Sequence, residues 1–153
     1  MFIIVVLYYK IITNMNLTDI LEYITTKLNE DQRLQSVYVD NVYECWNRTN
    51  SMNQYISAVV DFQNSNYMGD YCDYNFILYI GNMINEKQTN IYSSISISDS
   101  IAQQLLHKID TEEENGLTLV VPNNITPFVQ KFEDVLAGVY CIFTIRISAE
   151  IIC

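Results

Sequence analysis

Three aspartates in the middle of the chain, Asp61, Asp70 and Asp73, are the candidates for a catalytic or cation-binding site. Carboxylates held close together can act as acid and base, as an acid-dependent hydrolase requires, or can hold a cation through their oxygens. No recognisable ligand pattern accompanies these three in the sequence, and a solvated loop is the ordinary setting for such residues. We therefore expect a protein that is not an enzyme and binds no metal or cofactor.

The other reactive residues support the same expectation. The only histidine, His107, lies beside Lys108 in a segment with helical spacing, where an ordinary helix position explains it. The sequence has no Gly-x-Ser-x-Gly motif, and its four glycines form no phosphate-binding loop. The usual patterns of nucleophilic catalysis and nucleotide binding are therefore absent from the sequence.

The four cysteines, Cys45, Cys72, Cys141 and Cys153, contain no Cys-x-x-Cys pair, which argues against zinc. The first three fall in segments that we expect to be strands. A reduced thiol there behaves as a small buried hydrophobe. The sequence alone leaves a disulfide open.

The net charge of the chain limits which kinds of partner it can bind by electrostatic attraction. The chain carries 18 acidic and 8 basic residues, for a net charge of −10. Lys and Arg neutralise phosphates, so a protein this acidic is poorly suited to bind DNA by attraction. Like charge instead allows a polyanion to pass without sticking. Twelve tyrosines favour a role in protein–protein contact.

The apolar N-terminal segment, residues 1–14, requires a separate interpretation. Residues 2–12 are strongly apolar but fall short of the ~20 residues that cross a bilayer, and they lack the features of a signal peptide. We expect no membrane partner. Our hypothesis is that Met15 is the biological start and that residues 1–14 are an untranslated extension. The alternative is an extra edge strand or an arm that docks on a neighbour. Residues 15–153 are expected to form a single α+β domain.

Periodicity predicts the elements of that domain. Helical spacing covers residues 17–28, with Asn16 or Thr18 as cap, and a strand is expected at 37–46. Apolar runs at 54–62 and 71–84 predict one long β-hairpin whose turn is 63–70. Beyond it we expect a strand at 91–97, a helix starting at Ser98 or Asp99 and reaching Ile109, and a strand at 117–121. A turn at 122–127, a short irregular helix at 128–136 and a closing strand at 139–148 complete the prediction. This order predicts an α+β fold, with two to three helices packed on one face of a mainly antiparallel sheet.

The hairpin carries the functional prediction. Neither face of its second strand is cleanly polar, so another subunit is expected to cover part of it. The candidate subunit interface consists of aromatic residues in and near the hairpin: Tyr55, Tyr67, Tyr71, Tyr74 and Trp46. Trp46 also has the simpler interpretation of ordinary packing.

The element order, together with the segment 132–145 (FEDVLAGVYCIFTI), resembles the tail-terminator and tail-completion proteins of tailed bacteriophages. The similarity extends over about residues 16–148 and is detailed only in that segment. Frequent Asn, Ile and Tyr are typical of an AT-rich genome and fit phages of gut Bacteroides, crAss-like phages among them.

The resemblance implies a homo-oligomeric ring, sixfold or twelvefold, in the neck or tail of a virion assembled in the host cytoplasm. It implies contacts with portal-adaptor or other neck and tail ring proteins, non-specific passage of genomic DNA, and no catalytic residues. Asp61, Asp70 and Asp73 are then the candidates to face the channel. The alternative function is a small intracellular protein- or ligand-binding module, monomeric or dimeric, that uses the tyrosine-rich sheet.

Overall fold

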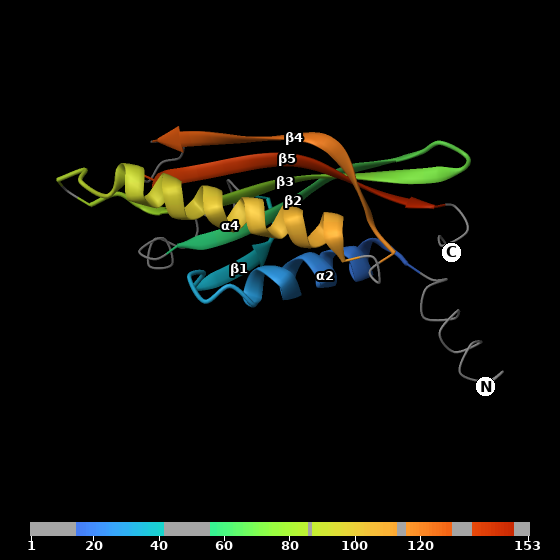
Figure 1. Cartoon of the computed structure of the whole chain (residues 1–153), viewed down its shortest axis with the longest axis horizontal. Coiled ribbons are helices and arrows are strands. Elements are labelled where there is room, and N and C mark those ends of the chain that lie inside the picture. Colours follow the sequence, from blue (N-terminus) through green and yellow to red (C-terminus); the bar gives the residue numbers. More distant parts are fainter. Residues whose placement is uncertain (1–14, 42–55, 86, 113–115, 130–135, 149–153) are drawn as a thin grey trace.

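The computed structural model describes residues 15–41, 56–85, 87–112, 116–129 and 136–148 (Figure 1). In chain order these residues form α2 (Leu17–Asn29), β1 (Ser36–Val39), β2 (Ser57–Tyr67), β3 (Tyr71–Met83), α4 (Ile91–Thr111), β4 (Thr118–Val129) and β5 (Leu136–Ser148). The strands make one sheet in the order β1-β2-β3-β5-β4. The β1–β2 pair is parallel and the other pairs are antiparallel, so the predicted α+β class with a mainly antiparallel sheet is confirmed.

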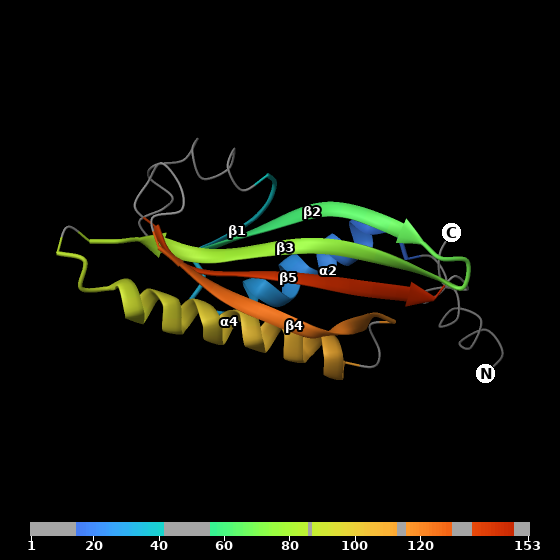
Figure 2. The same cartoon turned by 90° about the horizontal axis from the view of Figure 1, so that it is seen from above.

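The molecule has two layers. Helices α2 and α4 both lie against the same face of the sheet, and no helix of the described residues covers the opposite face (Figures 1 and 2). We call this opposite face the open face. None of the described helices is long and apolar enough to cross a lipid bilayer.

Helix α2 begins where the sequence offered two caps, and Asn16 is the one used. The Asn16 side chain accepts a hydrogen bond from the Asp19 backbone at 3.1 Å, and the Asp19 carboxylate accepts one from the Asn16 backbone at 2.9 Å. This reciprocal capping box satisfies N–H groups that the first helical turn leaves unpaired. It fixes the helix so that Ile20, Ile24 and Leu28 are buried against the sheet.

The main core lies between the helices and the sheet. Alternate residues of β2, β3 and β5 point to one side, because successive strand residues point to opposite faces. Phe76 and Phe143 stack at the centre, with ring centroids 5.4 Å apart. The other buried members from these strands are Ala58, Val60, Cys72, Tyr74, Leu78, Ile80, Val139, Cys141, Ile145 and Ile147.

The hairpin extends further than predicted. Strand β2 continues through polar residues to Tyr67, and the turn is confined to residues 68–70. The polar residues remain in the strand because their backbone pairs with β3, as Asn66 does with Asp73. Gly69 has φ +87°, which allows the reversal. Residues 63–70 are all exposed, and this end of the hairpin projects beyond both helices (Figures 1 and 2).

The predicted strand at 91–97 is wrong, because these residues form the first turns of α4. The residues that face the core there are Ser94 and Ser98, followed by Ile101 and Leu105. Serines at the buried positions concealed the helical period, and the alternating isoleucines resembled a strand.

The predicted turn at 122–127 is also wrong, and so is a helix beginning at residue 128. Strand β4 runs through Pro122 and Pro127 to Val129, with an irregular register between Val120 and Asn124. Because β4 is at the sheet edge, it accepts prolines whose missing N–H would face away from the neighbouring strand.

Several predictions lie partly or wholly outside the described residues. The first strand, predicted at 37–46, is observed at Ser36–Val39, and residues 42–46 are outside the described part. The same holds for residues 1–14 and for 130–135, which include most of the predicted third helix.

Candidate interaction surface

The part of the open face nearest the hairpin turn carries a row of linked polar side chains. Asn75 on β3 donates to Asn64 Oδ1 on β2 at 2.6 Å, and Thr144 on β5 donates to Asn75 Oδ1 at 2.6 Å. The register brings these residues together, since Asn75 pairs with both Asn64 and Thr144. The row therefore crosses three strands and presents amides and a hydroxyl rather than apolar groups.

Next to this row, Arg146 and Asp73 form a two-bond ion pair. The Arg146 Nε and Nη2 atoms donate to the two Asp73 oxygens at 2.8 and 2.9 Å. The guanidinium also lies over the Tyr71 ring, 3.7 Å from its centroid. Hydrogen bonding to Asp73 raises the pKa of Arg146 above its ordinary value. The charge of Asp73 is therefore locally compensated.

Of the three candidate aspartates, Asp61 and Asp73 lie on the open face and Asp70 is in the turn of the hairpin. Asp61 pairs in register with Ile77, four residues from Asp73 along β3. That spacing is roughly 13 Å, too far for two carboxylates to share a proton. The arrangement does not bring Asp61 and Asp73 together as acid–base catalysis would require.

The other end of the open face is apolar. Val59, Tyr79, Phe128 and Leu136 form a second buried cluster that includes no helix residue. Between this cluster and the polar row, Ile142 keeps 57% of its surface exposed. The open face thus changes from apolar to polar along its length.

The structure places the aromatic interface candidates in different environments. Tyr67 is 70% exposed at the hairpin end, and Tyr71 is half-buried beneath Arg146. The prediction that Tyr74 belongs to the subunit interface is wrong. Its side chain is 9% exposed and packs in the main core, because it lies on the helix-facing side of β3. Burial raises its pKa. Tyr55 and Trp46 lie outside the described residues.

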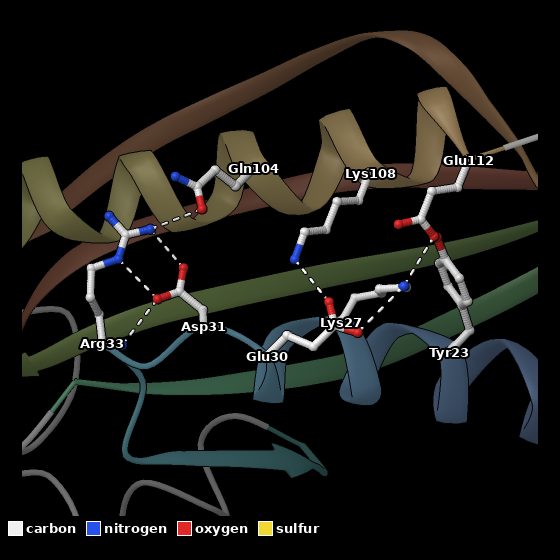
Figure 3. Close-up of polar contacts among 8 residues, drawn as sticks. All are labelled: Tyr23, Lys27, Glu30, Asp31, Arg33, Gln104, Lys108 and Glu112. Atoms are coloured by element: carbon white, nitrogen blue, oxygen red, sulfur yellow. Dashed lines mark hydrogen bonds and ion pairs between the residues drawn. The ribbon is translucent and has the colours of Figure 1, made fainter.

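On the opposite side of the sheet, a charged network joins the two helices (Figure 3). Tyr23 donates to Glu112 Oε2 at 2.6 Å, and the same oxygen lies 3.2 Å from Lys27 Nζ. Glu30 pairs with Lys27 at 3.4 Å and with Lys108 at 3.1 Å. These contacts join α2 to α4 along their exposed side.

A second part of the network follows α2. Arg33 pairs with Asp31 at 2.6 Å and donates to Gln104 of α4 (Figure 3). It also donates to Ser100 of the same helix. The Arg33 hydrogen bonds lower the pKa of Asp31. The bond from Tyr23 lowers the pKa of Glu112 in the same way. The network joins the two helices from outside, whereas on the open face Asn64 and Ile142 remain exposed.

No local pattern in the sequence indicated the polar row or the Asp73–Arg146 pair. Arg146 is far from Asp73 in the chain, and only the β3–β5 register places them opposite one another. Among the described residues, no group of His, Cys, Asp and Glu is arranged to hold a metal ion. His107 is exposed on α4.

A scan against models of known protein families and a search of curated proteins both find no match to this chain.

Proposed function

We propose that the protein is a structural ring subunit of a phage head-to-tail connector or tail, which closes a conduit for DNA and joins the neck to the tail. Subunits form a closed homo-oligomer, sixfold or twelvefold, through contacts between different surfaces of neighbouring copies. The ring docks on other neck, tail or portal-adaptor proteins. Its action is mechanical and requires no catalytic residue.

The observation that carries this proposal is the two-sided construction of the domain. A subunit of a tubular wall needs an outer side and an inner side with different properties. Here both helices cover one face, while the open face ends in a polar row and a projecting hairpin. In the proposed ring the helix layer faces outward and the open face lines the conduit.

The chemistry of the open face suits the passage of DNA. Asn64, Asn75 and Thr144 are uncharged, and Arg146 forms an ion pair with Asp73. A wall without free cations forms few attractive contacts with phosphates, and the overall negative charge opposes adhesion. Asp61 and Asp70 would add negative charge to this lining.

Imaging tests the proposal directly. Negative-stain microscopy of the full chain, and cryo-microscopy of virions that contain it, should show closed rings at the head–tail junction or in the tail. Because some ring proteins assemble only on their partners, the virion image is the deciding measurement. Virions that lack the protein, or a protein that stays monomeric and binds a small ligand through the sheet, would contradict the ring and favour the binding-module alternative.

A further inference from the structure

The two ends of the domain carry exposed apolar side chains. At the hairpin end, Tyr67 is 70% and Met68 is 60% exposed. At the other end, Tyr92 in the first turn of α4 is 85% exposed and Val129 at the end of β4 is 44% exposed. We call these two sites the tip and the base.

Register and connectivity place the base residues at the same end. Val129 pairs with Ala137, which pairs with Asn82 near the end of β3. A short connection then leads from β3 to Tyr92 in α4. Both views show the start of α4 and the end of β4 at the end of the molecule opposite the hairpin turn (Figures 1 and 2).

Among the described residues, the two ends also differ in charge. The tip contains Asp70, which is exposed, and the base contains Lys87, which is exposed in the connection before α4. The other four basic side chains of the described residues, Lys27, Arg33, Lys108 and Arg146, each pair with a carboxylate. Neither Asp70 nor Lys87 forms an ion pair with another described residue. An exposed acid beside apolar groups at one end thus complements an exposed base beside apolar groups at the other.

We infer that the tip of one copy docks on the base of a second copy, with Tyr67 and Met68 against Tyr92 and Val129, and Asp70 near Lys87. This inference rests on the proposed ring and names its neighbour contact. Because tip and base are different surfaces, the contact is heterologous and can repeat from copy to copy until a ring closes. A contact of tip with tip would instead place two Asp70 carboxylates together.

Chemical cross-linking tests which surfaces meet. In a full-length background in which Cys45 and Cys153 are serine, we would combine Met68→Cys with Tyr92→Cys and add a short bismaleimide. Tip-to-base contact should give a ladder of trimers and larger species, whereas each single variant should give no product beyond a dimer. A double variant whose products stop at the dimer would overturn the inference.

Charge reversal provides an independent measurement. Asp70→Lys and Lys87→Asp should each weaken self-association on the order of fivefold in sedimentation experiments, and the combined variant should recover it. Asp110→Lys, which alters an exposed acid on α4 and changes the net charge as Asp70→Lys does, serves as the control for that variant, and the combined variant restores the original net charge. Single reversals that behave like this control, or a combined variant without recovery, would overturn the pairing of Asp70 with Lys87.

The two proposals can fail separately. Rings seen in the virion without cross-linking between tip and base would leave the ring standing and reject this contact. Ladders from the double variant with no ring in virions would keep the contact and reject the phage function.

Discussion

Gly138 tests how closely the central strands must approach. It lies opposite Gly81 where β3 and β5 pair. A Cβ atom added at Gly138 would stand 1.9 Å from the Ile80 carbonyl oxygen and 2.6 Å from the Gly81 Cα. Because both contacts are with backbone, no side-chain rotation can relieve them, and the strands must separate by roughly 1 Å.

The cost of Gly138→Ala follows from this geometry. Overpacking costs about 1–3 kcal/mol, and each weakened backbone hydrogen bond adds about 1 kcal/mol. The smaller entropy of the unfolded alanine chain offsets about 0.4–1 kcal/mol. We expect the free energy of unfolding to fall by about 2–3 kcal/mol, which lowers the urea midpoint by about 1–2 M.

Urea unfolding followed by circular dichroism measures this shift. Gly69→Ala is the matched control, since nothing lies within 4 Å of its added Cβ and only the positive φ opposes alanine. That conformation costs about 1–2 kcal/mol, at or below the expected loss for Gly138→Ala. If Gly138→Ala unfolds at the wild-type midpoint, the β3–β5 register described above is incorrect.

Three further predictions concern the core and the helix layer. Burial raises the pKa of Cys141 to about 11. In a variant whose other cysteines are alanine, this thiol should therefore resist iodoacetamide at pH 8 until urea unfolds the chain. Rapid labelling of the folded protein would contradict the burial of Cys141. Ser98 Oγ is buried and has no hydrogen-bond partner in the described structure. Ser98→Ala should therefore raise the free energy of unfolding by about 1 kcal/mol more than Ser96→Ala, an exposed control on the same helix. An equal gain in the two variants would mean that Ser98 Oγ does have a hydrogen-bond partner. Hydrogen bonds from Lys108 and Tyr23 lower the pKa values of Glu30 and Glu112, respectively. The two ionised carboxylates therefore stabilise the fold at pH values above the ordinary pKa of 4.5, and this stabilisation is lost as the pH falls through the lowered pKa values. Acid titration should show a smaller loss of stability in Glu30→Gln than in the wild type.

Much of the fold could be predicted because local patterns determine it. The spacing of Ile20, Ile24 and Leu28 specifies the buried side of α2, and strict alternation specifies that of β5. The hairpin was evident from two apolar runs around a turn. Its true length was not, because polar strand residues are held by backbone pairing that composition does not reveal.

The candidate surface was predictable only in part. Asp61 lies on the open face and Tyr67 is exposed at the hairpin end, whereas Tyr74 has the same residue type as Tyr67 and is buried. Both tyrosines lie on the helix-facing side of the hairpin, since Tyr67 pairs with Cys72 of the main core, but the hairpin end that carries Tyr67 projects beyond both helices. Sequence-based reasoning could not distinguish the two without knowing how much of the sheet the helices cover.

Residue types and their spacing were sufficient to show which segments have an apolar side and that the chain is acidic. The tertiary structure was needed to show which face of each strand α2 and α4 cover, that Arg146 meets Asp73, and that exposed apolar residues occur at opposite ends of the domain. These features depend on pairing between residues distant in the chain, and such pairing is determined by the packing of the whole domain rather than by any local pattern.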